Sequence, residues 1–239
     1  MIFSNGLMGK ILSLENKAVA VTGASGTMGR SLTAELQRHG AQPIALTTST
    51  QATFADGVKV LSWQVGQESA LQSIFSEIDI LIINHGINVH GERTPEAIAR
   101  SLEVNSLSAL ALIDTFIAAL TLGDATDKEI WVNTSEAEAG PAFSPLYEIS
   151  KRLVGDLITL KRQDSPCVIR KIILGPFKSR LNPIGIMSAD WIAAMVIALA
   201  KRDCRNIIVT INPVTFLAFP LKEIAQSLYF RLFSQSPSA

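Results

Sequence analysis

The sequence has few of the residues that define several common protein classes. Its 239 residues include two cysteines, Cys167 and Cys204, and neither belongs to a CxxC pattern. A disulfide framework and a thiolate zinc site are therefore not expected, and a reducing compartment is the default. His85 and His90 have no carboxylate or cysteine at ligand spacing, so these histidines do not predict a metal site either.

Excess charge of one sign and long hydrophobic runs are missing as well. Lysine and arginine total 21, as do aspartate and glutamate, so the net charge is zero and no nucleic-acid partner is expected. The longest apolar segments, 189–200 and 213–221, are shorter than the roughly 18 residues of a membrane-spanning helix. Residues 1–16 lack the apolar core of a secretory signal and are interpreted as a short amphipathic lead-in. A cytoplasmic protein is expected.

The residues that are present form short apolar runs that alternate with helical patterns. Strands are predicted at 17–23, 41–49, 58–65, 79–86, 128–135, 167–175 and 205–211. Helices are predicted at 29–40, 69–78, 94–120, 147–161 and 188–202, with Thr94 and Ser188 as N-caps. Near-continuous apolar strands separated by helices indicate a parallel sheet covered on both faces. We therefore expect an α/β fold with one Rossmann-type, doubly wound parallel sheet of about seven strands.

Three glycines follow the first predicted strand at three-residue spacing, in the segment VTGASGTMGRSL. At such a turn, glycine lets backbone N–H groups approach a pyrophosphate, and the next helix adds its positive dipole end. The residues predicted to line this phosphate site are Gly23, Ser25, Gly26, Thr27, Met28 and Gly29. The alternative is a tight turn with a purely structural role.

The end of the second predicted strand bears on the choice of cofactor. An NAD site usually places Asp or Glu there to hold the ribose 2′-hydroxyl. This chain has Thr47, Thr48 and Ser49 instead, and no acid before Asp56. Because hydroxyls can donate to a 2′-phosphate that a carboxylate would repel, NADP is the expected cofactor, with NAD as the alternative. Arg30 is either a phosphate partner or a solvent-facing residue.

Further segments complete a pattern that resembles the short-chain dehydrogenase/reductase family from Lys17 to about Ile211. ILIINHGI resembles the family's NNAG strand end, and is closer to the form in membrane-associated hydroxysteroid dehydrogenases. LEVNSLSAL and WVNTSEAEAG resemble the segments with the catalytic asparagine and serine, and YEISK matches YxxxK. The glycine loop resembles TGxxxGxG with one departure, because Gly26 stands one position early and Thr27 takes the usual place.

The resemblance implies an NAD(P)(H)-dependent oxidoreductase that moves a hydride between the cofactor and a carbonyl or alcohol. Tyr147 would be the proton donor or acceptor, and Lys151 would favour the phenolate and hold the nicotinamide ribose. Ser135 would polarise the substrate oxygen, and Asn105 would anchor a proton-relay water. Asn105 could instead be a buried residue at a helix kink. The chain could also be a non-catalytic NADP-binding sensor or assembly factor.

The same resemblance places further residues around the cofactor and makes 17–212 the predicted NAD(P)-binding catalytic domain. Beyond the glycine loop, Tyr147 and Lys151, these predicted contacts are Thr48, Ser49, Gln64, Val65, Asn84, His85, Gly86, Gly175, Pro176, Phe177 and Ser179. Glu136 and Glu138 are expected either to face solvent or to repel acidic substrates.

The segment after the sixth strand is expected to form a short substrate lid. Its predicted apolar lining consists of Phe177, Leu181, Ile184, Ile186 and Met187, which favours a lipid-like substrate over a sugar. The apolar tail, 213–239, has three interpretations: packing on the same domain or on a partner, a membrane-surface helix, or a disordered end. A homo-oligomer is expected, and the membrane-surface interpretation would make the protein peripheral at a membrane.

Overall fold

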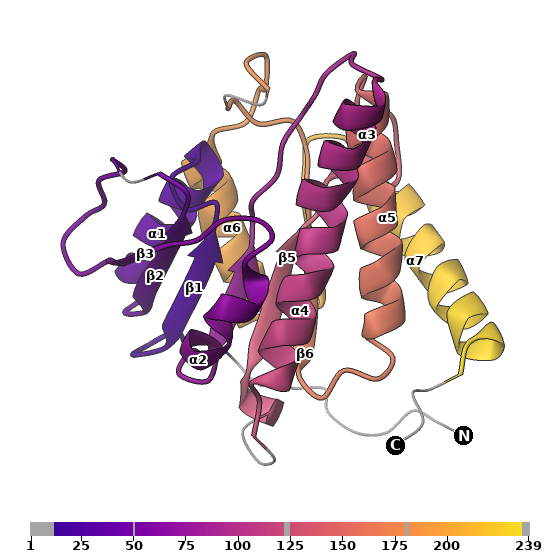
Figure 1. The fold of residues 1–239 in the computed structure, drawn as a ribbon. Helices are drawn as coiled ribbons and strands as arrows, with labels where there is room; N and C mark the ends of the chain where they lie inside the picture. Colours follow the sequence, from indigo (N-terminus) through magenta and orange to yellow (C-terminus); the bar gives the residue numbers. More distant parts are fainter. Residues whose placement is uncertain (1–11, 50, 122–124, 180–181, 236–239) are drawn as a thin grey trace.

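In the computed structural model, which describes residues 12–49, 51–121, 125–179 and 182–235, the chain forms the predicted α/β fold. Seven parallel strands lie in the order β3-β2-β1-β4-β5-β6-β7 (Figure 1). The strands are β1 Ala18–Thr22, β2 Gln42–Thr47, β3 Lys59–Ser62, β4 Ile80–Ile83, β5 Glu129–Asn133, β6 Val168–Leu174 and β7 Asn206–Val209. The strand order reverses between β1 and β4, and ligands of such sheets bind beyond the carboxyl ends of the strands at this point.

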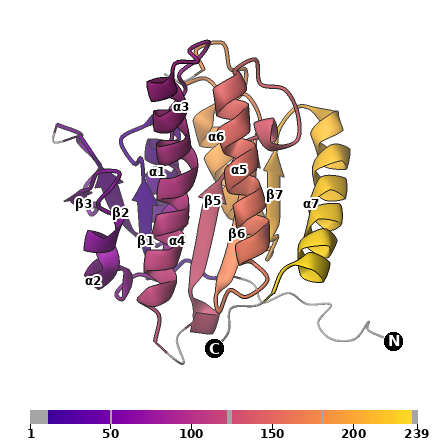
Figure 2. The same ribbon diagram turned by 45° about the vertical axis from the view of Figure 1, so that its right-hand side comes forward.

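Helices cover both faces of the sheet (Figure 2). They are α1 Thr27–Arg38, α2 Gln72–Phe75, α3 Pro95–Leu102, α4 Ser108–Ala118, α5 Pro145–Lys161, α6 Ala189–Lys201 and α7 Pro213–Phe233. α1 and α6 pack on one face, where Leu32 and Ile192 share a core with Val19 of β1. α4 packs on the other face, where Phe116 shares a second core with Ala20. Successive strand residues point to opposite faces, so the apolar strands supply both cores.

The helix predicted at 94–120 changes its geometry in the middle. Thr94 caps its start by accepting a hydrogen bond from the Ala97 N–H (3.1 Å). α3 then passes through a π-helical turn, Glu103–Leu107, into α4. Among the described helices this is the one that is long and apolar enough to cross a membrane, with a mean hydropathy of 1.3. Because it lies against the sheet with Phe116 fully buried, we interpret it as a core helix.

α7 packs on the same domain, beside α5 (Figures 1 and 2). Asn212 caps its start by accepting a hydrogen bond from the Val214 N–H (3.1 Å). Its buried residues, Thr215, Phe219 and Glu223, recur every four positions and therefore share one face. Packing on the same domain is thus confirmed for this face, and the expectation of a disordered end is wrong as far as residue 235.

A buried cluster of charges joins α7 to the sheet. Lys171 of β6 is fully buried (0% exposed), and its ammonium donates to Glu138 (2.9 Å), Glu223 (2.7 Å) and Thr159 (2.7 Å). Lys222 of α7 donates to Glu138 as well (3.1 Å). Burying an ammonium is costly unless carboxylates pair with it. The cluster therefore holds β6, α5, α7 and the segment after β5 in one arrangement.

Removal of this ammonium should destabilise the fold strongly. In Lys171→Met, the Glu223 and Glu138 carboxylates lose a buried partner, and we expect a loss of about 3–5 kcal/mol in the free energy of unfolding. The control is Lys161→Met, which breaks the exposed ion pair with Asp114 and should cost no more than about 1 kcal/mol. Urea unfolding measures both, and equal losses in the two variants would contradict a structural role for the cluster.

Candidate active site

The glycine loop between β1 and α1 is shaped by close backbone contacts. Gly23 has φ +61°, and a Cβ there would lie 2.8 Å from the His85 backbone. A Cβ on Gly29 would lie 2.4 Å from the Gly23 carbonyl oxygen, so a side chain at either position would disrupt the turn. Gly26 differs, because a Cβ there would meet only the Gly23 carbonyl, at 3.2 Å. The exposed side of the loop at Gly26 therefore consists of bare backbone.

This bare backbone fits the diphosphate of a nicotinamide dinucleotide. Gly26 is the N-cap of α1, no side chain caps the helix, and no acidic residue stands in its first turn. N–H groups at a helix start carry partial positive charge and bind anions when no side chain occupies them. Thr27 and Met28 open the helix, and Met28 can contribute only its backbone because its side chain is buried in the core.

β2 ends in hydroxyl residues beside the glycine loop. The Thr47 hydroxyl donates to Ser25 Oγ (2.9 Å) and accepts from the Ser49 N–H (3.1 Å). Thr48 and Ser49 are exposed. The strand end therefore presents hydroxyls and no carboxylate to the space beyond the loop.

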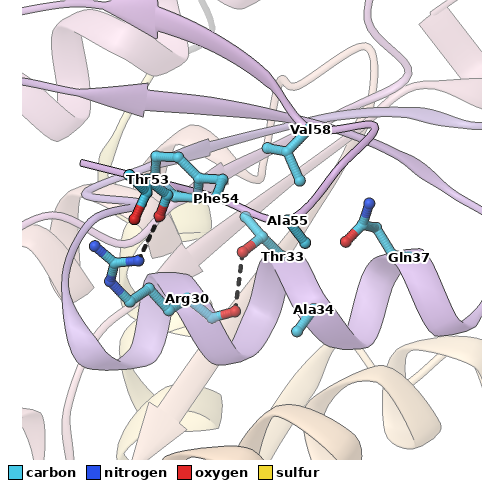
Figure 3. A pocket seen from close by; sticks show the side chains of 8 residues that line it. All are labelled: Arg30, Thr33, Ala34, Gln37, Thr53, Phe54, Ala55 and Val58. Carbon is cyan, nitrogen blue, oxygen red and sulfur yellow. Dashed lines mark hydrogen bonds between the residues drawn. The ribbon is translucent and has the colours of Figure 1, made fainter. Parts of the chain in front are cut away.

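Arg30 is exposed, as one interpretation held, but its guanidinium is bound on two sides. Nε donates to the Ser25 carbonyl (3.1 Å) and Nη1 to the Thr53 carbonyl (2.7 Å), and the group lies 5.3 Å from the Phe54 ring centre. Arg30, Thr53 and Phe54 help to line a cleft of about 130 Å³ between α1 and the segment after β2 (Figure 3). The cleft contains none of the predicted catalytic residues. Arg30 instead fastens the segment after β2 to the glycine loop.

His85, a predicted cofactor contact, packs behind the glycine loop. Its Nδ1 shares a hydrogen bond with the Thr22 hydroxyl (2.9 Å), and its ring meets Trp63 edge to face at 5.0 Å between centres. Burial, together with the nearby Lys151 charge, lowers the pKa of His85 to about 3. The imidazole is therefore neutral at physiological pH and cannot serve as a cationic phosphate ligand.

The other predicted cofactor residues follow the ends of β3, β4 and β6. They are Gln64, Val65, Asn84, Gly86, Gly175, Pro176, Phe177 and Ser179. Because the carboxyl ends of parallel strands meet at one edge of the sheet, these residues lie along the same edge as the glycine loop.

Ser135, Tyr147 and Lys151 come together beyond the end of β5. Tyr147 and Lys151 are one turn apart on α5, and the Lys151 ammonium lies 5.6 Å from the Tyr147 ring centre. Burial raises the pKa of the Tyr147 phenol, and a hydrogen bond with Ser135 opposes this rise. An ammonium at this position favours the phenolate further. The three side chains have the arrangement that proton transfer at a substrate oxygen needs.

Lys151 is anchored by an asparagine that the sequence analysis missed. The buried Lys151 ammonium donates to the Asn133 carbonyl (3.1 Å), and the Asn133 amide donates to Asn84 Oδ1 (2.6 Å). Burial lowers the pKa of Lys151 to about 8, while the charge of Glu138 opposes this shift. Within the described residues, the buried Asn133 Oδ1 has no hydrogen-bond partner. An open acceptor beside the lysine fits a hydroxyl of a bound ribose.

Asn105, in the π-helical turn, connects the loop after β4 to α5 through hydrogen bonds. Its Oδ1 accepts from the Ile87 N–H (2.8 Å), and its amide donates to the Ile87 carbonyl (3.0 Å) and to Ser150 Oγ (3.0 Å). The Ser150 hydroxyl in turn donates to the Tyr147 carbonyl (2.9 Å). Asn105 therefore holds the loop after β4 against α5, which supports its interpretation as a buried residue at a helix irregularity. The relay through a bound water stays a prediction. Ser150 belongs to the same set of hydrogen bonds.

The expectation that Glu136 and Glu138 face solvent is wrong. Glu138 is 1% exposed because Lys171 and Lys222 neutralise its carboxylate. Glu136 is half-buried and accepts hydrogen bonds from Thr210 (2.7 Å) and from Thr215 of α7 (3.2 Å). Both carboxylates point into the contact with β7 and α7. The partners of both residues are distant in the sequence, so local patterns could not have predicted these positions.

In the segment after β6, which was predicted to form a substrate lid, the apolar residues only partly lie where the prediction placed them. Met187 is buried in the core below the sheet edge, and Phe177 packs against the same core. Ile184 and Ile186 are instead exposed, and Leu181 lies outside the described residues. Pairing of Phe177 with Met187 closes the segment on itself, which turns their side chains inward.

The chain resembles known proteins in sequence and in structure. Residues 19–150 match the family described as the NAD dependent epimerase/dehydratase family. A curated relative from Synechocystis sp., named monoglucosyldiacylglycerol epimerase, is 56% identical over 236 residues, or 96% of this chain. This chain spans 58% of the length of that relative.

Two solved structures share the fold. A short chain dehydrogenase from Burkholderia cenocepacia in complex with NADP has a TM-score of 0.75 at 20% identity, covering 94% of this chain and 100% of that chain. The ligand-free aldohexose dehydrogenase of Thermoplasma acidophilum has a TM-score of 0.69 at 19% identity, covering 94% of this chain and 98% of that chain.

These findings confirm the resemblance to short-chain dehydrogenases at the level of the fold and correct its finer part. The curated relative is an epimerase, so the suggested closeness to membrane-associated hydroxysteroid dehydrogenases is wrong. The matched residues include the glycine loop, Asn105, Ser135 and Tyr147. The chain belongs to the NAD dependent epimerase/dehydratase family.

Proposed function

We propose that this chain epimerises a hydroxyl-bearing carbon in the sugar headgroup of a glycolipid, by oxidising that carbon transiently and reducing the ketone from its other face. The arrangement of Ser135, Tyr147 and Lys151 carries the chemistry of this proposal. The 56% identity to a relative named for epimerising monoglucosyldiacylglycerol supports the substrate class. Such a substrate has a lipid part but reacts at its sugar. The proposal therefore replaces the sequence-based choice of a lipid-like substrate over a sugar with a molecule that contains both.

The chemistry divides between the cofactor and the side chains. When bound, the nicotinamide supplies the hydride acceptor and donor. Tyr147 takes the hydroxyl proton as the C–O bond becomes a carbonyl and returns the proton when the ketone is reduced. Ser135 donates a hydrogen bond to the substrate oxygen, and the Lys151 ammonium stabilises the phenolate. The hydride and the hydroxyl proton both return to the substrate, so only its configuration changes.

Loss of the Tyr147 hydroxyl should abolish epimerisation without preventing cofactor binding. We expect Tyr147→Phe to lower kcat by about 10²–10⁴-fold, the usual contribution of a positioned acid–base group. Tyr229→Phe is the matched control, because Tyr229 is the other tyrosine of the chain and is exposed on α7. Monoglucosyldiacylglycerol is supplied in detergent micelles, and chromatography of the reaction mixture separates the two epimers. Full activity of Tyr147→Phe would refute the assignment, and net formation of a ketone by the wild type would favour a simple dehydrogenase.

The activity should fall at alkaline pH as Lys151 loses its proton. With the pKa of Lys151 lowered to about 8, kcat/KM should decline through that pH, because the neutral amine no longer stabilises the phenolate. The charge of Glu138 raises this pKa, so Glu138→Gln should move the decline to lower pH. A pH–rate profile measures both. An unchanged alkaline limb in Glu138→Gln, with the variant folded, would contradict the coupling.

The hydroxyls at the end of β2 should favour NADP over NAD. We expect Thr48→Asp to weaken NADPH binding at least about tenfold, because a carboxylate would repel the 2′-phosphate, while NADH binding holds or improves. Thr48→Asn is the control of equal size without charge. Fluorescence titration gives the dissociation constants of both cofactors for the wild type and the two variants. A wild type that binds NADH more tightly than NADPH would reverse the proposed preference.

A further inference from the structure

The outward face of α7 carries many exposed apolar side chains. Nine large apolar side chains between Val214 and Phe233 are more than half exposed, with Leu217 at 68% and Leu232 at 75%. Single exposed apolar residues are ordinary, but contiguous patches mark interaction surfaces. An apolar stripe along a helix of 21 residues therefore calls for a partner.

The charged and apolar residues of α7 are arranged in the opposite way to those of an ordinary surface helix. Its acid, Glu223, is buried against Lys171 and Arg162 (2.9 Å). Lys222 turns inward to Glu138 and to Asp156 (2.9 Å). A surface helix of a soluble protein normally places charged residues outward and apolar residues inward. In α7, two of the three charged residues face the protein, and most of the large apolar residues face away from it.

The charge on the outward face suits a lipid surface. Arg231 is its exposed charged residue, and among the described residues of the helix no exposed carboxylate accompanies it, because Glu223 is buried. Tyr229 and Phe233 are exposed as well and lie one turn apart, with their ring centres 4.9 Å from each other. A broad apolar face with aromatic residues, together with a cation elsewhere on the same helix, is typical of helices that lie in the interface of a bilayer.

The width of the apolar face also favours lipid over a second copy. At about 100° per residue, the exposed apolar positions cover more than roughly half of the helix circumference. One partner helix covers a narrower stripe. A fluid layer of acyl chains, by contrast, can surround a convex ridge of this width.

The start of α7 and two further exposed apolar residues lie near the candidate site. The first turn of α7 contacts it directly, since Thr215 donates to Glu136, the neighbour of Ser135. Phe143 is 97% exposed and has φ +55°, and Ile184 is 89% exposed. Both residues lie in loops that follow strands, β5 and β6 respectively, and therefore at the carboxyl edge of the sheet.

We propose that the outward face of α7 seats the protein on a lipid bilayer, with the helix axis in the plane of the surface. The site mouth then lies at the level of the headgroups, so a glycolipid sugar can enter while its acyl chains stay in the bilayer. Delivery of the substrate rests on the proposed function. Seating on the bilayer does not.

The test compares two triple variants of the whole chain. Leu217→Glu/Leu221→Glu/Leu228→Glu places three carboxylates on the α7 face. The control, Val60→Glu/Ile98→Glu/Leu160→Glu, adds the same charge at exposed apolar positions on β3, α3 and α5. Each variant is sedimented with vesicles of phosphatidylcholine and phosphatidylglycerol. NADPH binding and sedimentation velocity are measured in parallel to establish folding and oligomeric state.

We expect the wild type and the control to sediment with the vesicles, and the α7 variant to bind at least tenfold more weakly. Absence of wild-type binding, or equal binding by all three proteins, would overturn the proposal. So would conversion of an oligomer to a monomer in the α7 variant with vesicle binding unchanged, which would assign the face to a second copy. A water-soluble short-chain alkyl glucoside separates the two proposals. If the wild type seats on vesicles but epimerises neither this glucoside nor the lipid, the proposed function fails alone.

Discussion

The buried ammonium of Lys171 is the constraint around which half of the molecule is arranged. A cation in the middle of a sheet must be matched by carboxylates, and here they come from Glu138 and Glu223, far apart in the chain. Gly155 provides the space, because a Cβ there would lie 2.1 Å from the Glu138 carboxyl carbon. Since Glu138 follows Ser135 by three residues and Gly155 follows Lys151 by four, the same cluster positions the segments that carry the proposed catalytic residues.

The chemistry of the site follows from burial at this edge of the sheet. Desolvation keeps His85 neutral and brings the pKa of Lys151 to about 8, within reach of physiological pH. The carboxylate of Glu138 keeps the lysine cationic over part of that range. Asn105 fixes the loop after β4 to α5 and so sets the height of Tyr147 relative to the cofactor site. Structural groups thus supply the electrostatics on which the proposed acid–base pair depends.

α7 has one face that binds the domain and another face that is exposed. Its inward residues, Thr215, Lys222 and Glu223, bind the segment after Ser135 and the ionic cluster. Its outward residues form the apolar face. The inversion has a simple cause, because the carboxylates and ammonium groups of the domain attract the charged residues of the helix and leave its apolar ones outside. Seating α7 on a surface would therefore hold the segment beside Ser135 as well.

The local pattern of residues was sufficient to determine the parallel sheet, most of the helices, the glycine loop and the pairing of Tyr147 with Lys151. Each of these depends on spacing within a short segment, such as one helical turn or one strand–turn–helix unit. Tertiary structure alone decided the fate of Glu138, the role of Asn133 and Ser150, and the inverted orientation of α7. These depend on contacts such as Lys171 with Glu223, which join residues 52 positions apart. From the sequence alone, a charged residue is expected to face solvent. Only the fold shows the opposite charge that permits its burial.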